Sequence, residues 1–158
     1  MIKVGIGYDV HRLKKGEELF IGGIKIPSAF GSEGHSDGDA LIHAIVDGLL
    51  GAAGLGDIGK YFPSDDDRWK GAESRLFLSD AHGKIKNAGY KINNIDSTVI
   101  LARPRLAQHT TDIVNNLAEI LDIDKSRISV KATTTDGLGF IGDGLGWGVL
   151  AIVSISDK

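Results

Sequence analysis

Two different spacings of apolar residues alternate along this chain, and this alternation limits its fold more than any other feature. Residues 2–8 are short and rich in β-branched side chains, which is typical of a strand, whereas Leu41 and Ile45 begin a series at helical intervals. Helices are predicted from Asp39 to the glycines at 51 and 54, over 72–88 and over 106–121. Strands are predicted at 2–8, as two short strands within 19–27, and at 90–102, 127–133 and 147–155.

The order of these segments suggests one domain that mixes helices and strands. With 158 residues, of which 42% are hydrophobic, the chain has the size and the apolar content for a single core. Hairpin and crossover connections both occur in the predicted order, which is typical of an α+β domain. We therefore predict a single domain over residues 1–158, with a mixed β-sheet covered on one face by helices in a ferredoxin-like arrangement.

The charge and the composition exclude several classes of protein. A net charge of -3 provides no basic surface for nucleic-acid phosphates, so nucleic acid is not an expected partner. The chain has no cysteine, which excludes disulfides and thiolate metal sites and leaves His, Asp and Glu as strong ligands. No apolar run reaches membrane-spanning length, so we expect a cytoplasmic protein with no membrane partner.

Three residues are candidates to bind one metal ion. Asp9 and His11 stand two apart at the end of the first predicted strand, where alternate residues project from the same face. His43 lies inside the first predicted helix, and Asp39 and Asp47 lie one turn before and after it, close enough to orient the imidazole. Two histidines and one aspartate would leave a zinc ion an open coordination position, as in catalytic zinc sites.

Each of these residues also has an ordinary structural interpretation. An Asp-x-His sequence at a strand end commonly forms turn hydrogen bonds. His43 alone could be a helix residue whose hydrogen bonds are satisfied. The pattern of residues leaves both interpretations open.

The polar run from His35 to Asp39 leads into the first predicted helix. Its acidic residues suit an N-cap and the first turn of a helix. Capping does not need His35, however, and an imidazole beside the backbone donors of a helix start is well placed to meet an anion. We interpret His35 as a phosphate contact and part of the run as a cap.

A second polar run, from Lys131 to Asp136, leaves a predicted strand for a glycine-rich loop. Its threonine hydroxyls suit phosphate oxygens and Asp136 suits magnesium, although three threonines in a strand can equally reflect β propensity. Residues 137–142 match G-x-G-x-x-G, but further glycines replace the helix that a dinucleotide site needs. The run at 64–67, with three aspartates, either forms a solvated loop or binds substrate hydroxyls.

Several motifs together resemble one enzyme family over nearly the whole chain. They are Asp9-Val10-His11, His35 to Asp39 with His43, Leu55 to Gly59 with Phe62-Pro63, and Lys131 to Phe140. By these motifs the chain resembles the 2-C-methyl-D-erythritol 2,4-cyclodiphosphate synthases. They occur in the family's order and at compatible spacing, which is far more specific than a single glycine pattern.

The resemblance implies an enzyme of the non-mevalonate isoprenoid pathway. Such an enzyme converts 4-diphosphocytidyl-2-C-methyl-D-erythritol 2-phosphate, a cytidine diphosphate derivative, to the cyclic diphosphate and CMP. The resemblance also implies a homotrimer with active sites between subunits. It assigns zinc to Asp9, His11 and His43, and it assigns to Asp136 a second divalent cation, Mg²⁺ or Mn²⁺, that bridges the diphosphate.

The remaining site residues follow from the same resemblance. His35 and Thr134 stand at the family's transition-state positions and would hydrogen-bond to the phosphates. Residues 57–59 would meet the methylerythritol part, and residues 101–107 would cradle cytosine and ribose. The predicted substrate-binding residues are Ser36, Asp57, Ile58, Gly59, Phe62, Asp66, Leu101, Ala102, Arg103, Pro104, Arg105, Leu106, Ala107, Thr133, Thr135 and Phe140.

Three positions depart from the family's usual pattern. Asp136 stands where Glu is common, and its carboxylate is one methylene shorter but can still bind a hard cation. Ser64 stands where an acidic residue is frequent, so Asp66 or its neighbours must supply any carboxylate contact there. Asp143 stands where some relatives carry an arginine that lines a trimer-axis cavity for isoprenoid diphosphates, and its charge would repel such ligands.

Two other functions stay open at this point. A zinc-dependent phosphoesterase would use the same ligands to activate water for attack on a phosphate. A non-catalytic trimeric sensor of metals or nucleotides would bind its ligand without turnover. The identity of the product separates these functions from a cyclodiphosphate synthase.

Overall fold

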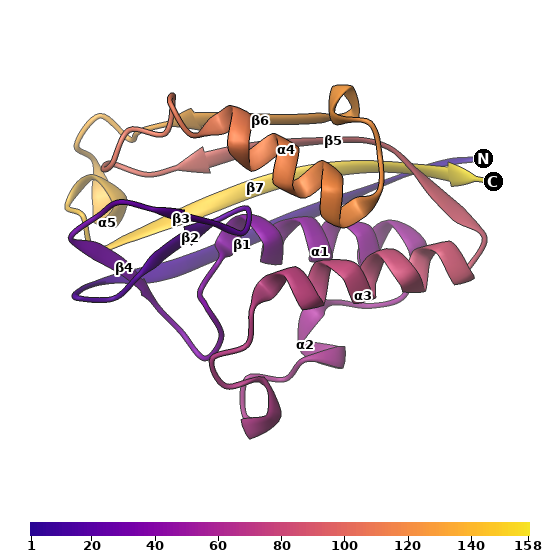
Figure 1. Cartoon of the computed structure of the whole chain (residues 1–158), viewed down its shortest axis with the longest axis horizontal. Helices are drawn as coiled ribbons and strands as arrows, with labels where there is room; N and C mark the ends of the chain where they lie inside the picture. Colours follow the sequence, from indigo (N-terminus) through magenta and orange to yellow (C-terminus); the bar gives the residue numbers. More distant parts are fainter.

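The computed structural model describes residues 1–158 and combines a large sheet, a small hairpin and a layer of helices (Figure 1). The strands are β1 (Ile2–Lys15), β2 (Leu19–Ile21), β3 (Ile24–Ile26), β4 (Phe30–Glu33), β5 (Tyr90–Ile100), β6 (Ile128–Thr133) and β7 (Gly146–Asp157). The α-helices are α1 (Ala40–Ala53), α2 (Ile58–Tyr61), α3 (Ser74–Asn87), α4 (Thr110–Leu121) and α5 (Gly139–Gly142). Two 3-10 helices, η1 (Asp67–Trp69) and η2 (Lys125–Arg127), complete the chain.

The large sheet has five strands in the order β4-β1-β7-β5-β6. Strands β5 and β6 are parallel, whereas the other neighbouring pairs are antiparallel. Helix α4 lies between β5 and β6 in the chain, as a parallel pair requires a crossover connection. The sheet is therefore mixed, and the α+β fold class predicted from the sequence is confirmed.

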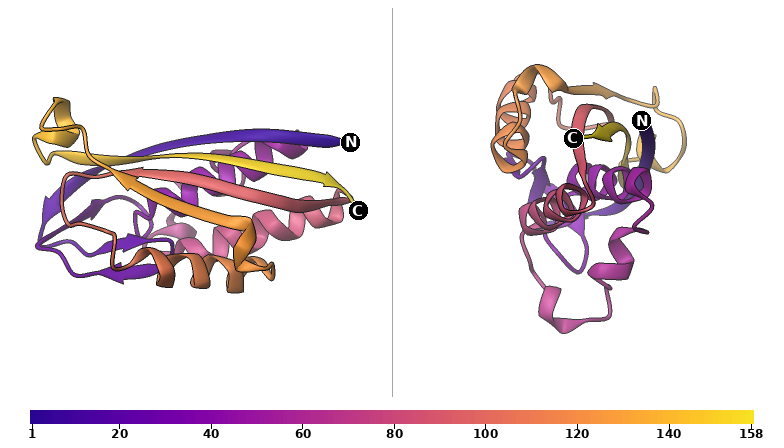
Figure 2. Two further views of the ribbon diagram at one scale, coloured as in Figure 1. Left: turned by 90° about the horizontal axis from the view of Figure 1, so that it is seen from above. Right: turned by 90° about the vertical axis from the view of Figure 1, so that its right-hand side faces the viewer.

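Helices cover one face of this sheet. Helices α1 and α3 run along it, and the end-on view in Figure 2 shows α4 on the same side. Trp147 of β7 is fully buried beneath this layer together with the apolar residues of α1. None of the helices is long and apolar enough to cross a membrane.

The opposite face of the sheet is apolar and exposed. Ile6 on β1 pairs with Ile152 on β7, and Tyr8 pairs with Leu150. All four side chains are exposed, by 42 to 67%. Because their neighbours in each strand point toward the helices, these residues form an uncovered apolar surface on the far side of the sheet.

Glycines allow α1 to lie directly on β1. A Cβ atom at Gly7 would lie 1.7 Å from the carbonyl oxygen of Ala44, and one at Gly5 would lie 1.9 Å from that of Gly48. No side chain fits between the two backbones at these points. This contact brings the first half of α1 close to the segment of β1 that follows Gly7.

Asp39 fixes the start of α1. Its buried carboxylate accepts hydrogen bonds from the backbone N–H of Ile42 at 3.0 Å, of Gly22 at 3.0 Å and of Gly23 at 2.6 Å. It therefore caps the helix and also binds the turn between β2 and β3. Burial raises the pKa of Asp39 to about 6, against the effect of these backbone donors.

Some predicted boundaries were wrong. Strand β1 continues to Lys15 because its second half pairs with β4, from Arg12 opposite Glu33 to Lys15 opposite Phe30. Helix α4 begins at Thr110 and not at Leu106, because residues 106–109 form a turn in which the N–H of His109 donates to the Leu106 carbonyl at 2.8 Å. The short elements β4, α2 and α5 were not predicted, since three or four residues carry no measurable period.

Candidate metal centre

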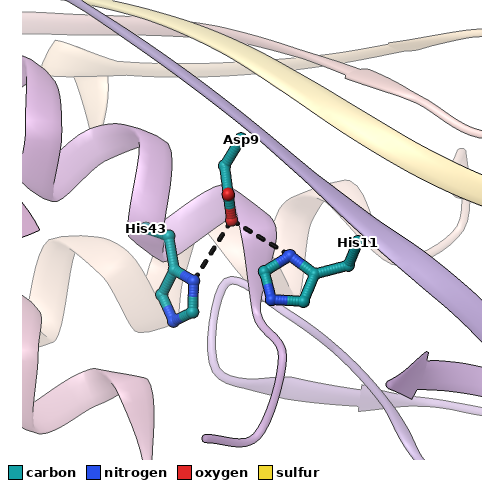
Figure 3. A group of neighbouring side chains, drawn as sticks. All are labelled: Asp9, His11 and His43. Atoms are coloured by element: carbon teal, nitrogen blue, oxygen red, sulfur yellow. Dashed lines mark hydrogen bonds and ion pairs between the residues drawn. The ribbon is translucent and has the colours of Figure 1, made fainter. Parts of the chain in front are cut away.

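Three polar side chains meet where β1 passes the first turns of α1. Asp9 and His11 project from β1 and His43 from α1, and their ligand atoms all lie within 4.8 Å of one another (Figure 3). One carboxylate oxygen of Asp9 lies 3.1 Å from Nδ1 of His11 and 3.1 Å from Nδ1 of His43. The two imidazole rings therefore present the same kind of nitrogen toward a single carboxylate.

This group fits a metal ion. Two imidazole nitrogens and one carboxylate oxygen are a ligand set that zinc accepts, with a coordination position left for another ligand. Nδ1 of His11 is buried and makes no hydrogen bond, despite its distance of 3.1 Å from Asp9. A buried nitrogen without a hydrogen-bond partner is costly unless something else occupies its lone pair, and a metal ion would do so.

The electrostatics of the group favour an ionised Asp9 and a protonated His43. Burial acts to raise the pKa of Asp9, but the imidazoles of His11 and His43, whose Nδ1 atoms both lie 3.1 Å from its carboxylate, outweigh it and lower the pKa to about 2. Burial acts to lower the pKa of His43, yet the hydrogen bond to Asp9 and its charge hold that pKa above the ordinary value. Asp9 is therefore an anion at neutral pH, ready to attract a cation.

The carboxylates predicted to orient His43 have other partners. Asp39 caps α1, and Asp47 accepts a hydrogen bond from the N–H of Ile58 at 2.8 Å. Nε2 of His43 lies instead 2.8 Å from the hydroxyl of Ser74 and 3.3 Å from that of Ser36. The prediction of a direct carboxylate partner one turn away on the helix is wrong, because both carboxylates bind backbone groups.

A pocket of about 260 Å³ opens beside the metal-ligand group. The ring of His35 lines it, with Nε2 2.9 Å from the carbonyl oxygen of Asp66, so Nδ1 is the ring nitrogen left for a further contact. Phe62 packs against Trp69 and Phe77, with ring centroids 5.0 and 4.4 Å away. The lining residues are His11, His35, Ser36, His43, Ile58, Gly59, Phe62, Ser64, Trp69 and Phe77.

A second pocket, of about 170 Å³, lies where β5 ends and beside the end of β6. It has no lining residue in common with the first. Its walls are mainly apolar, which suits the face of a base. The lining residues are Leu101, Ala102, Pro104, Arg105, Leu106, Ala107, Ala132, Thr133 and Thr134.

Several predicted site residues line neither pocket. Asp57 caps α2 by accepting from the N–H of Lys60 at 2.9 Å, and Asp66 caps η1 and pairs with Arg68. Asp136, in a left-handed backbone conformation with φ of 52°, lies outside the metal-ligand group. Arg103, Thr135 and Phe140 also lie outside both pockets.

Three residues of this region were not predicted as site residues. Ser74 contacts His43, and Trp69 and Phe77 line the pocket. In the sequence, Phe77 only continues the apolar series of a helix, and Ser74 stands in no motif with a known ligand spacing. Packing of α3 against α1 brings them to the site, and no local pattern records that packing.

A larger hollow of about 610 Å³ shares Ser36 with the first pocket. Carboxylates of Glu17, Glu18, Asp37 and Glu73 line it, and Arg75 is its one cationic side chain. This charge would repel a phosphate-bearing ligand. The smaller pocket beside the metal-ligand group is therefore the better candidate for a phosphorylated substrate.

Comparison with known proteins agrees with this geometry. The model of the YgbB family matches residues 2–156. A 2-C-methyl-D-erythritol 2,4-cyclodiphosphate synthase from Alkaliphilus oremlandii is 51% identical over 154 residues, which cover 98% of both chains.

Solved structures also match. The bifunctional IspDF from Campylobacter jejuni superposes with a TM-score of 0.97 and 41% identity over 100% of this chain, which spans 43% of that longer chain. The Plasmodium falciparum IspF in complex with CDP superposes with a TM-score of 0.88 and 37% identity, covering 99% of this chain and 97% of its own. The chain thus belongs to the YgbB family, that of the 2-C-methyl-D-erythritol 2,4-cyclodiphosphate synthases.

Proposed function

We propose that this chain converts 4-diphosphocytidyl-2-C-methyl-D-erythritol 2-phosphate to 2-C-methyl-D-erythritol 2,4-cyclodiphosphate and CMP, a step of the non-mevalonate isoprenoid pathway. One observation carries the proposal: a chain of this family places Asp9, His11 and His43 beside a pocket lined by His35 and Ser36. It is therefore an enzyme, a lyase that forms a cyclic diphosphate.

The reaction needs no nucleophile from the protein. An oxygen of the substrate's 2-phosphate attacks the β-phosphorus, a new P–O–P bond forms, and the bond from that phosphorus to the oxygen of CMP breaks. The protein has to fold the substrate so that the two phosphates meet, and to offset the negative charge that gathers there. Catalysis of this kind depends on positioning and on preorganised hydrogen bonds.

We assign zinc to Asp9, His11 and His43 and a second divalent cation, Mg²⁺ or Mn²⁺, to Asp136. Bound there, such cations polarise phosphate oxygens and neutralise developing charge. The buried, unbonded Nδ1 of His11 and the low pKa of Asp9 support the first assignment. The exposed position of Asp136 beside the Thr134 hydroxyl supports the second.

The polar residues around the pocket have distinct roles in this proposal. His35 holds its ring by donating from Nε2 to the Asp66 carbonyl, and in its protonated form it also donates from Nδ1 to a phosphate oxygen. Thr134 hydrogen-bonds to the phosphates from the end of the cytidine pocket, whose other lining residues are Leu101, Ala102, Pro104, Arg105, Leu106, Ala107, Ala132 and Thr133. The remaining predicted substrate contacts are Ser36, Asp57, Ile58, Gly59, Phe62, Asp66, Arg103, Thr135 and Phe140.

A homotrimer would join the two pockets of different subunits. Within one chain the metal pocket and the cytidine pocket have no common wall, although one substrate must reach both. The exposed apolar face with Ile6, Tyr8, Leu150 and Ile152 offers a surface for self-association. The ferredoxin-like description of the subunit stays a prediction, as does the trimer.

Phosphorus NMR tests the function directly. The purified protein is incubated with the substrate, zinc and magnesium, and its products are followed in time. Cyclic diphosphate together with CMP is the expected result. CMP with an open product would favour a phosphoesterase, and no turnover by folded, zinc-loaded protein would favour a sensor.

A further inference from the structure

The two nitrogens of His43 meet different surroundings. Nδ1 faces Asp9 at 3.1 Å, on the side where His11 also points (Figure 3). Nε2 points the other way, to the hydroxyl oxygen of Ser74 at 2.8 Å. The position of the single proton of a neutral imidazole therefore decides which nitrogen can bind a metal.

Ser74 is fully buried at the start of α3 and is held by Asp37. Its backbone N–H donates to one carboxylate oxygen of Asp37 at 2.8 Å, and its hydroxyl donates to the other. The N–H of Asp37 in turn donates to the carbonyl of Ala72 at 3.1 Å. The carboxylate and the hydroxyl thus have one fixed arrangement, and an anion at the first N–H of a helix is favourable.

The donors and acceptors of the hydrogen bonds that link Asp37, Ser74 and His43 can be counted. A serine hydroxyl has one proton, whereas an ionised carboxylate can only accept. The Ser74 proton is committed to Asp37, so the Ser74 oxygen can only accept from His43. Nε2 of His43 must therefore keep its proton, and Nδ1, which faces Asp9 and His11, is the nitrogen that can bind a metal once it has lost its own proton.

We infer that Asp37 and Ser74 are positioning residues that fix the tautomer and the ring orientation of His43 for metal binding through Nδ1. Neither residue bears a ligand atom of the metal group. The inference rests on the metal assignment proposed above and adds the carboxylate and the hydroxyl that act through His43. Hydrogen bonding to the outer nitrogen of a ligating histidine is a common requirement of such sites.

The test measures zinc affinity and one NMR signal in four forms of the full chain: wild type, Ser74→Ala, Asp37→Asn and Ser36→Ala. Affinity is obtained by competition with a chromophoric chelator. The signal is the Nε2–H proton of His43 in the ¹⁵N-labelled, zinc-loaded protein. Ser36→Ala is the matched control, since its hydroxyl lies 3.3 Å from the same nitrogen but has no bond to Asp37.

Ser74→Ala is expected to weaken zinc binding roughly 10- to 100-fold and to expose the Nε2–H proton to fast exchange with water. Asp37→Asn keeps one acceptor oxygen for three donors, the N–H and hydroxyl of Ser74 and the N–H of Asp39, so it should change both readouts in the same direction by less. If Ser74→Ala does not fold, the two readouts of Asp37→Asn alone test the inference. Ser36→Ala should bind zinc within about threefold of wild type, well below the change expected at Ser74.

The outcomes separate the two proposals. If wild type binds no zinc, the metal assignment is wrong and the inference falls with it. If wild type binds zinc while Ser74→Ala and Asp37→Asn bind it equally well and keep a protected Nε2–H, only the inference is overturned. An effect of Ser36→Ala as large as that of Ser74→Ala would also overturn it.

Discussion

The backbone of Gly7 touches the carbonyl of Ala44, the residue after the metal-ligand candidate His43, so closely that a Cβ atom would lie 1.7 Å from that oxygen. A methyl group there meets backbone and not a movable side chain, so α1 would have to shift away from β1. The spacing of His43 from Asp9 and His11 depends on this contact.

We expect Gly7→Ala to lower the free energy of unfolding by roughly 1–3 kcal/mol and to weaken zinc binding at the same time. Urea denaturation and chelator competition measure the two effects. Gly51→Ala is the control, because it lies in the same helix with nothing within 4 Å of its added methyl group. It should be neutral or stabilising, by about 0.5–1 kcal/mol. Equal stability of Gly7→Ala and wild type would contradict the close approach.

His43→Ala is expected to remove bound zinc and nearly all turnover, because a three-ligand site that loses one imidazole holds the ion poorly. Metal content after dialysis and the rate of CMP release measure these losses. His82→Ala, in α3 and outside the metal-ligand group, should retain both. Full activity of zinc-free His43→Ala would exclude the assignment.

Zinc binding should release protons near pH 6.5. The pKa of His43 lies above 6.5 in the metal-free protein, so at this pH most of its imidazole is protonated and must lose the Nδ1 proton to the solvent. Zinc affinity therefore falls as the pH decreases through this raised pKa, whereas Asp9, with a pKa of about 2, does not compete above pH 4. Calorimetry in two buffers of different ionisation enthalpy measures the proton release. Identical heats in both buffers would count against a protonated His43.

Asp136→Asn should lower turnover by on the order of 100-fold at limiting magnesium, because the neutral amide offsets little of the cation's charge. Asp136→Glu should retain most of the turnover, since it restores the longer carboxylate that is usual in the family. Titration of magnesium at constant zinc measures the effect. If the two variants lose activity equally, Asp136 does not bind the second cation through its charge.

Asp39→Asn is expected to cost roughly 1–3 kcal/mol of stability. An amide has one acceptor oxygen, so its NH₂ group would face at least one of the three backbone N–H groups, two of them buried, that now donate to the carboxylate. Asp124→Asn provides the comparison: this exposed residue caps η2 through the N–H of Ser126 at 2.8 Å and should cost less than about 1 kcal/mol. Chemical denaturation gives both values.

Local patterns in the sequence predicted the fold class and most of the long elements. Helix α1 follows from its apolar spacing and from Asp39, which caps it as predicted. The end of β1 could not be predicted, because Arg12 to Lys15 form a strand only by pairing with β4, a contact that depends on residues far along the chain. Bounds set by long-range pairing carry no local signal.

The sequence predicted the three candidate metal ligands but not the residue that orients His43. The Asp-x-His spacing on β1 and His43 on α1 sufficed to suggest one metal site, and the structure brings the three side chains together. The orientation of His43 was assigned to the wrong carboxylates. Its partner Ser74 comes from a helix whose sequence shows no ligand pattern, so only the packing of α3 on α1 reveals it.

The two ends of the chain lie side by side at one end of the sheet, where the Met1 amino group pairs with the Asp157 carboxylate (Figure 1). Asp9 lies eight residues from Met1, roughly 26 Å further along the chain at about 3.3 Å per residue. A second domain can therefore be appended to either end without passing over the metal pocket. A short linker between residues 158 and 1 would likewise give a circular permutant, with new ends opened in an exposed loop, that keeps its pocket accessible.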